Sequence, residues 1–211
     1  MLVRAKMDAL MSIASGREIK YLTPMQLDMI TRAFENWLEP ARGEKQFMRR
    51  LRHWIIFLTL RYTGARLGEV LMIDDNVDID IRNGEIRIVN LKRHNPEKKG
   101  QKRQVPVPSH LIAEIAKAWA EFPILKGNLF KIDSSVFRKM FLARCREANI
   151  ERKLSHPHVL RHTRAIELLR AGVPITGVQQ LLGHSFLSTT AVYLMLSGRE
   201  IKDMLRDKGL I

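Results

Sequence analysis

Five side chains that could act on a phosphate ester are spread along the chain: Arg66, His158, Arg161, His184 and Tyr193. A guanidinium group can hold two phosphate oxygens at once, and an imidazole exchanges protons near neutral pH. A tyrosine hydroxyl can serve as a covalent nucleophile. Taken alone, Tyr193 has a plainer explanation, because it stands among apolar residues and could belong to the core. The segments around these residues therefore have to be considered together.

The first segment is RYTGARLGEVL, residues 61–71. Gly64 is predicted to end a helix, and Arg66 and Glu69 then stand three positions apart on one face of the next element. By itself this spacing favours an ordinary ion pair in contact with solvent, which contributes little free energy.

The second segment is SHPHVLRHTRA, residues 155–165, in which Pro157 is predicted to begin a helix. His158, Arg161 and His162 then project from its first turns on one side, and a helix N-terminus with an arginine favours an anion. Two alternatives are a polar helix end without function and a zinc site on the two histidines. The zinc site is disfavoured because the glutamate of an HExxH motif is missing and Arg161 would repel a cation.

The third segment is LLGHSFLSTTAVY, which carries His184 and, nine positions later, Tyr193. In this order and spacing the three segments resemble the catalytic domain of tyrosine recombinases, the phage-integrase family. The resemblance extends from about Tyr21 to Ser197. Each motif alone is weakly diagnostic, whereas three in series that end in LGH and a tyrosine are specific.

The resemblance implies cleavage of DNA by attack of the Tyr193 hydroxyl on a phosphodiester, which yields a 3′-phosphotyrosine that the 5′-hydroxyl of a partner strand resolves. Arg66 and Arg161 match the pair of arginines that holds the non-bridging oxygens. His158 matches the acid–base histidine, and His184 matches a second hydrogen-bond donor to the phosphate. No metal ion or other cofactor is implied, because the arginines supply the positive charge.

The same resemblance implies an acidic residue that supports the arginine site, matched by Glu69, and a lysine on the sheet that protonates the leaving 5′-oxygen. An unbulged strand would place Lys92 on the same face as Ile86, Ile88 and Asn90, towards the protein, so Lys92 is the predicted general acid. Other lysines of the basic stretch are alternatives for this role. Five basic residues are predicted to contact the DNA backbone: Arg93, Lys98, Lys99, Lys102 and Arg103.

The composition agrees with a DNA partner. The formal net charge is +14 and the pI about 10.3, an excess that attracts polyanions, of which nucleic acid is the commonest. A membrane surface is disfavoured because no basic amphipathic helix with an aromatic face appears, no apolar run approaches the ~20 residues of a span, and no signal peptide is recognisable. Cys145 is the single cysteine, so no internal disulfide can form, which fits a reducing cytoplasm. The expected location is cytoplasmic and nucleoid-associated.

The apolar periodicity predicts an α+β fold that is mainly α-helical, with a small three-stranded antiparallel sheet. A capping box at Thr23–Gln26 starts the first long helix. Strands are predicted within 77–91, around a primed two-residue turn at Asn83-Gly84, and at 104–108, with the basic stretch 92–103 as a loop. Four helices follow Ser109, at 109–121, 134–148, 157–171 and 174–182.

One catalytic domain is expected at 21–197, after a leader at 1–20 and without a separate N-terminal DNA-binding domain. The tail at 198–211 has the pattern of a short amphipathic helix, which is unstable in water unless its apolar side is buried. The family resemblance implies that this tail docks into a neighbouring subunit of a tetramer on double-stranded DNA.

Three other functions compete with this interpretation. The stretch IELLRAGVPITGVQQLLGH could be the helix-turn-helix of a non-catalytic DNA-binding regulator. A type IB topoisomerase would share the tyrosine chemistry but relax supercoils without joining two sites. A metal-dependent nuclease is disfavoured because carboxylates do not cluster in the sequence.

Overall fold

The computed structural model describes residues 20–39, 42–91, 100–183 and Arg206. It is mainly α-helical with one three-stranded antiparallel sheet, as the sequence predicts. The elements follow in the order α2 (Pro24–Leu38), α3 (Glu44–Thr63), α4 (Leu67–Val70), β1 (Ile79–Asp80), β2 (Glu85–Val89), β3 (Lys102–Pro106), α5 (Ser109–Glu121), η2 (Pro123–Leu125), α6 (Ser134–Glu147), η3 (Arg152–Leu154), α7 (His158–Arg170) and α8 (Ile175–Leu182).

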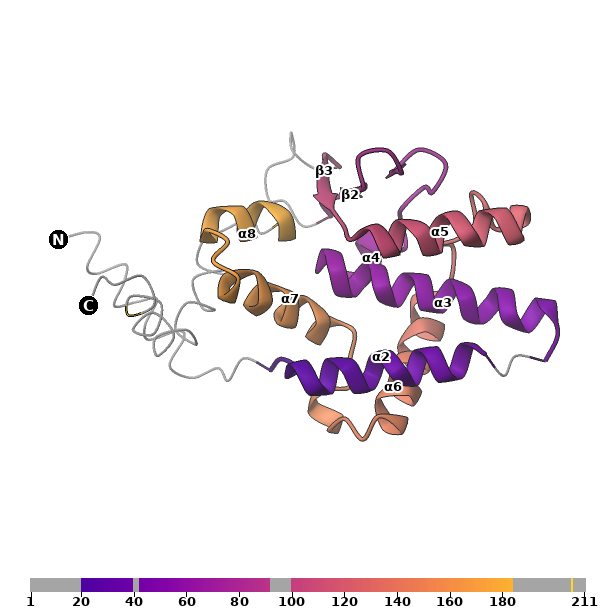
Figure 1. Cartoon of the computed structure of the whole chain (residues 1–211), viewed down its shortest axis with the longest axis horizontal. Coiled ribbons are helices and arrows are strands. Elements are labelled where there is room, and N and C mark those ends of the chain that lie inside the picture. Colours follow the sequence, from indigo (N-terminus) through magenta and orange to yellow (C-terminus); the bar gives the residue numbers. More distant parts are fainter. Residues whose placement is uncertain (1–19, 40–41, 92–99, 184–205, 207–211) are drawn as a thin grey trace.

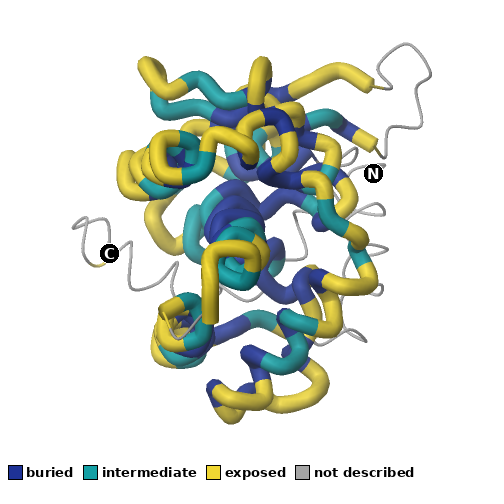
Figure 2. The backbone as a smooth tube through the Cα atoms, turned by 90° about the vertical axis from the view of Figure 1, so that its right-hand side faces the viewer, coloured by how far each residue is buried: buried dark blue, intermediate teal, exposed yellow. Residues whose placement is uncertain are grey.

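Helix α3 runs through the middle of the molecule, with α5 on one side, α2 on the other, and α7 packed against it (Figure 1). Five consecutive residues of α3, from Trp54 to Leu58, are buried, which is typical of a helix surrounded by other elements. The buried backbone accordingly gathers in the interior, and the exposed stretches lie outside it (Figure 2). No helix in the described part of the chain has the length and apolar composition needed to cross a bilayer.

The predicted capping box at the start of α2 is confirmed. The Thr23 hydroxyl accepts from the backbone N–H of Gln26 over 3.2 Å, and the Gln26 side chain accepts from the N–H of Thr23 over 2.9 Å. Just before it, the N–H of Leu22 donates to the Thr163 hydroxyl over 3.0 Å. The start of α2 is thereby fixed to α7, the helix that carries the second motif.

The predicted two-residue turn between the first two strands is wrong. Asp80 pairs with Glu85, so the connection consists of the four residues 81–84. The carboxylate of Asp80 accepts from the backbone N–H of Asn83 over 3.0 Å and from its side-chain amide over 2.9 Å, which closes a wider loop. Gly84 has a φ of 66°, whereas Asn83 has a negative φ and so cannot form a primed turn.

The third strand also begins earlier than predicted. Lys102 pairs with Val89 and Arg103 with Ile88, so these two basic residues belong to β3 and not to the preceding loop. Because side chains alternate along a strand, Arg103 points to the same side as the buried Val105.

The helices after Ser109 lie where they are predicted, within one residue at each end. Gly172 and Gly183 adopt positive φ angles of 80° and 71° after α7 and α8, as expected for residues that end a helix. Cys145 is completely buried, and burial raises the pKa of its thiol to about 12, in agreement with a core residue. Helices α7 and α8 pack on each other through a small apolar cluster: Ala165, Ile166, Val178 and Leu182.

Candidate active site

The turn before Arg66 is where the three motifs first meet. Helix α3 ends at Gly64, which has a φ of 61° and donates its N–H to the carbonyl oxygen of Leu60 over 3.0 Å. A Cβ atom at Gly64 would lie 2.4 Å from Leu182 of α8 and 3.2 Å from Arg164 of α7. Only a glycine therefore allows α7 and α8 to approach this turn so closely.

Arg66 and Glu69 form a specific pair at the start of α4. Glu69 accepts from the backbone N–H of Arg66 over 3.1 Å with Oε2 and from Nη1 of Arg66 over 2.7 Å with Oε1. The Glu69 side chain is fully buried, while that of Arg66 is 24% exposed. The simpler interpretation, a solvent-exposed ion pair, is therefore wrong: a buried carboxylate holds a guanidinium at the surface of the site.

Glu69 binds a second arginine from the sheet. Nη2 of Arg103 donates to Oε2 of Glu69 over 2.9 Å, and both side chains are buried. Burial alone would raise the pKa of Glu69, but the charge of Arg103 and the hydrogen bonds from Arg103 and Arg66 outweigh it, and the pKa lies below its ordinary value. Glu69 is accordingly ionised at neutral pH and neutralises part of the charge of two arginines.

Helix α7 presents Arg161 to the same turn. Arg161 is 2% exposed, and its Nη1 donates to the carbonyl oxygen of Gly64 over 2.9 Å. Since Arg66 follows Gly64 by two positions, this bond brings the two arginines of the first and second motifs into one region of the molecule.

His158 stands on the first turn of α7 and is exposed. Its ring meets that of His162 edge to face, with ring centroids 4.6 Å apart. Burial and the nearby charges of His158, Arg161 and His156 lower the pKa of His162 to about 4, so His162 is neutral at pH 7. A neutral His162 therefore packs against an accessible His158 without adding charge.

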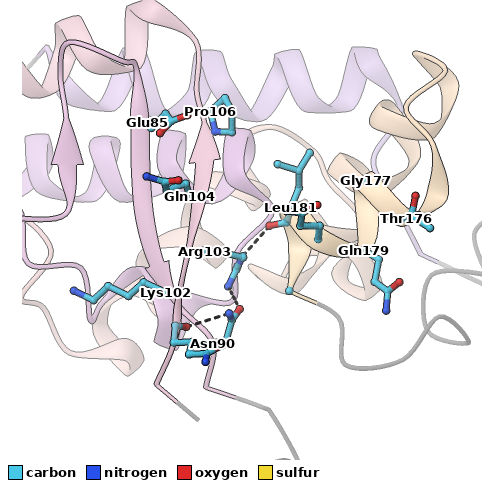
Figure 3. A pocket seen from close by; sticks show the side chains of 13 residues that line it. Glu85, Asn90, Lys102, Arg103, Gln104, Pro106, Thr176, Gly177, Gln179 and Leu181 are labelled. Atoms are coloured by element: carbon cyan, nitrogen blue, oxygen red, sulfur yellow. Dashed lines mark hydrogen bonds between the residues drawn. The ribbon is translucent and has the colours of Figure 1, made fainter. Parts of the chain in front are cut away.

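The end of α8, directly before His184, rests on the sheet. The carbonyl oxygen of Leu181 accepts from Nε of Arg103 over 2.8 Å, and Nη1 of Arg103 donates to Oδ1 of Asn90 over 2.6 Å (Figure 3). Asn90, Arg103 and Gly183 line a hollow of about 750 Å³ between the sheet and α8. Sequence reasoning did not assign Asn90 or Arg103 to this junction.

The two predicted DNA-contacting residues of β3, Lys102 and Arg103, point to opposite sides of the strand. Arg103 is 7% exposed and its guanidinium is directed to Glu69, Asn90 and Leu181, so it does not present a surface to a phosphate. The physical reason is the alternation of the strand, which turns Arg103 inward. Lys102 points outward, where it is 41% exposed and pairs with the buried Asp78 over 2.6 Å.

Several predicted site residues lie outside the described part of the chain. Lys92 is predicted from the alternation of Ile86, Ile88 and Asn90, and these three residues, in β2 and directly after it, are all buried. The residues outside the described ranges are Lys92, Arg93, Lys98, Lys99, His184 and Tyr193.

His158 and His162 are the pair that could suggest a metal. Within the described ranges, no group of three or more His, Cys, Asp or Glu side chains is arranged to hold an ion. Arg161 lies between the two histidines on the same helix, α7, and is buried there. Its positive charge opposes the binding of a metal ion.

The convergence of these motifs agrees with a match to a known family. The profile of the phage integrase family matches residues 20–199, which is most of the chain. The chain belongs to the phage integrase family. The matched region of this integrase-family chain contains all the active-site residues considered above.

Two relatives of this integrase-family chain are named tyrosine recombinases. XerC of Pelotomaculum thermopropionicum is 34% identical over 167 residues, which cover 70% of this chain and 51% of that protein. XerA of Pyrococcus furiosus is 28% identical over 171 residues, with 77% of this chain and 56% of the relative covered. The chain thus spans about half the length of the curated relatives it matches.

Two solved structures illustrate the fold of this family member. The post-cleavage complex of XerH site-specific recombinase with palindromic difH substrate has a TM-score of 0.71 at 20% identity and covers 89% of this chain and 53% of that one. The catalytic domain of bacteriophage HP1 integrase has a TM-score of 0.59 at 21% identity, covering 90% and 95%. The integrase-family chain therefore has the tyrosine recombinase catalytic-domain fold.

Proposed function

We propose that the protein is a site-specific DNA recombinase that cleaves and rejoins strands through a 3′-phosphotyrosine at Tyr193. The observation that carries the proposal is the junction at Gly64. There the carbonyl oxygen accepts from Arg161, and Leu182, two positions before His184, packs against the glycine. Three segments far apart in sequence, each with a residue suited to phosphoryl transfer, thus converge on one turn.

The two arginines would stabilise the charge that builds up on phosphorus. In the transition state of attack by a tyrosine hydroxyl, negative charge grows on the two non-bridging oxygens, and a planar guanidinium can donate to both. Arg161 is already fixed by its bond to Gly64, and Arg66 by Glu69. Such prior ordering avoids a reorganisation step when the phosphate arrives.

The remaining roles concern protons and hydrogen bonds. Lys92 would protonate the 5′-oxygen when its bond to phosphorus breaks and the phosphate becomes attached to Tyr193. His158 would act in acid–base exchange from its exposed position on α7. His184 would donate a second hydrogen bond to the phosphate, and Glu69 would support the arginines. Positive charge from side chains makes a metal ion unnecessary in this mechanism.

Double-stranded DNA is the proposed substrate, bound by a tetramer in which the tail at 198–211 is exchanged between subunits. The net charge of +14 supports an anionic partner. Among the structural neighbours, XerH recombinase is described in complex with its difH substrate and the Tn1549 integrase with transposon right end DNA. We also propose that the protein is cytoplasmic and associated with the nucleoid. Its catalytic domain would extend over residues 21–197.

The test is selection of DNA by covalent capture. The protein is incubated with a pool of duplexes that carry a nick beside a randomised core, so that cleaved ends diffuse away and the adduct is trapped. Molecules that stay attached to the protein in detergent are then sequenced. We expect adducts enriched in one site, with the 3′-phosphate on Tyr193 when the peptide is mapped by mass spectrometry.

Tyr193→Phe is the matched control, because it removes a single oxygen. This variant should bind the selected DNA with unchanged affinity and form no adduct. Binding without any adduct from the unaltered protein would favour the helix-turn-helix regulator. Relaxation of supercoiled DNA without joining of two sites would favour a topoisomerase, and loss of cleavage in chelator would favour a metal-dependent nuclease.

A further inference from the structure

The guanidinium group of Arg103 donates three hydrogen bonds, one from each of its nitrogens. Nη2 donates to Glu69 over 2.9 Å, Nη1 to Asn90 over 2.6 Å, and Nε to the carbonyl oxygen of Leu181 over 2.8 Å. Two of these bonds are visible in Figure 3, where Arg103 lies between the sheet and α8. Each of the three nitrogens is thus directed to a different segment of the chain.

Each partner of Arg103 belongs to a segment that carries a proposed active-site residue. Glu69 holds the guanidinium of Arg66 over 2.7 Å. Asn90 precedes Lys92 by two positions, and Leu181 precedes His184 by three. A single buried cation therefore connects the arginine, lysine and histidine segments of the site.

We propose that Arg103 is a positioning residue that sets the relative placement of these three segments, and that it does not bind DNA; this inference rests on the proposed function. A buried ion pair is stable only when its geometry and hydrogen bonds are nearly complete, and the Arg103–Glu69 pair meets this condition. The planar fork of arginine allows three bonds in fixed directions. A lysine would keep the charge but lose this geometry.

The packing of Gly183 shows how closely α8 depends on this arginine. A Cβ atom at Gly183 would lie 2.4 Å from Oδ1 of Asn90 and 3.0 Å from Cζ of Arg103. The backbone immediately before His184 therefore rests on the Asn90–Arg103 pair. A shift of Arg103 would move this backbone and release Glu69 at the same time.

The experiment compares Arg103→Lys with Arg87→Lys. Arg87 lies on the neighbouring strand, opposite Gln104, is exposed, and donates to the carbonyl oxygen of Val77 outside the site. Both variants preserve the net charge. We expect Arg103→Lys to lower the cleavage rate at saturating DNA by tenfold or more, with the DNA affinity and its salt dependence unchanged from the control.

Hydrogen exchange supplies a measurement that needs no cleavage. In Arg103→Lys, the amides of residues 66–70 and 179–183 should both exchange faster than in Arg87→Lys, because the two segments lose a common anchor. If the unaltered protein forms no adduct with any DNA, the proposed function fails. The exchange data then decide the positioning role alone: faster exchange in both segments supports it, and unchanged exchange overturns it.

Two further results would also overturn the inference. One is a fall in DNA affinity with a smaller salt slope and an unchanged cleavage rate on bound DNA, as expected for a phosphate contact. The other is full activity of Arg103→Lys. Should this variant not fold, the double variant Glu69→Gln/Arg103→Met removes both buried charges together. It should fold and bind DNA but cleave at least tenfold more slowly, whereas cleavage at the normal rate would exclude the positioning role.

Discussion

Arg161 of α7 donates to the carbonyl oxygen of Gly64 over 2.9 Å, and so one of the two proposed phosphate-binding arginines is held by the turn that precedes the other. The bond fixes the direction of a buried side chain, of which 2% is exposed. The bond also orders the guanidinium beside the turn from which Arg66 follows two positions later. This arrangement makes Arg161 the most direct test of the arginine mechanism.

Arg161→Lys should reduce the rate of cleavage by about a hundredfold or more, the scale observed when one transition-state donor is lost. The lysine ammonium keeps the charge but lacks the planar fork that directs separate nitrogens to Gly64 and to the phosphate oxygens. The measurement is the rate of adduct formation on the selected DNA, with affinity from gel shifts, and affinity should change little. Arg138→Lys, at an exposed position of α6, is the control. A collapse of affinity with a normal rate on bound DNA would instead assign Arg161 to DNA positioning.

Lys92→Ala should be rescued by a substrate whose bridging 5′-oxygen is replaced by sulfur. A thiolate leaves without a proton, so the general acid is no longer needed. The relevant quantity is the ratio of cleavage rates on the sulfur and oxygen substrates, which should rise only in the Lys92 variant. Alanine variants of Lys98, Lys99 and Lys102 serve as comparisons. Sulfur rescue of one of these would transfer the role to it, although Lys102 is already paired with Asp78.

Gly183→Ala should disturb the site more than its backbone angle alone explains. Both Gly183 and Gly172 have positive φ, and alanine in this region costs about 1 kcal/mol. At Gly172 an added Cβ meets nothing within 4 Å, whereas at Gly183 it would lie 2.4 Å from Asn90. Urea unfolding should therefore show a larger loss in the free energy of unfolding for Gly183→Ala than for the control Gly172→Ala. The cleavage rate should fall only in Gly183→Ala. Equal losses in the two variants would mean that α8 can move away from the sheet without consequence.

Helix boundaries and core residues were predictable from the sequence because they depend on local signals. Thr23 and Gln26 form a capping box wherever the backbone starts a helix, and Gly64 ends one by adopting a left-handed conformation. The site was less predictable, since the environment of Glu69 depends on β3, a distant strand. An i, i+3 pair looks the same in sequence whether it is solvated or buried.

The role of Arg103 was missed although a signal was present. Its position within a run of basic residues suggested a basic loop that contacts phosphate. Yet Arg103 stands two positions before Val105, and strand alternation turns both to the same side. The sequence does not show where β3 begins, because the pairing of Lys102 with Val89 depends on the partner strand β2.

Acidification should destabilise the protein in a window between about pH 6.5 and pH 4. Burial lowers the pKa of His162 from 6.5 to about 4, and burial also lowers the pKa of His53 and His156. In this window the histidines of the unfolded chain bind protons, whereas the same histidines stay neutral in the folded chain. The stability present above pH 6.5 is therefore lost as the pH falls. The part due to His162 is at most about 3 kcal/mol.

The measurement is the free energy of unfolding in urea at pH 7, 5.5 and 4.5. His162→Gln should flatten the pH dependence over this range, whereas replacement of the exposed His158 by Gln should not reduce it as much. An identical slope in the His162 variant and the unaltered protein would contradict the lowered pKa. Glu69 contributes a further loss at the acidic end of this range, because its pKa in the folded chain lies below its ordinary value of 4.5, so protonation disfavours the folded state.

The inert thiol of Cys145 makes the protein convenient for fluorescence work. It is the single cysteine of the sequence, completely buried, and its pKa of about 12 leaves almost no thiolate at neutral pH. A maleimide dye will therefore react only with a cysteine that is introduced at the surface. With Arg206→Cys, at an exposed position of the tail, donor-labelled and acceptor-labelled subunits can be mixed on DNA. Energy transfer between them would report directly on the arrangement of tails in the assembled complex, with the native core unaltered.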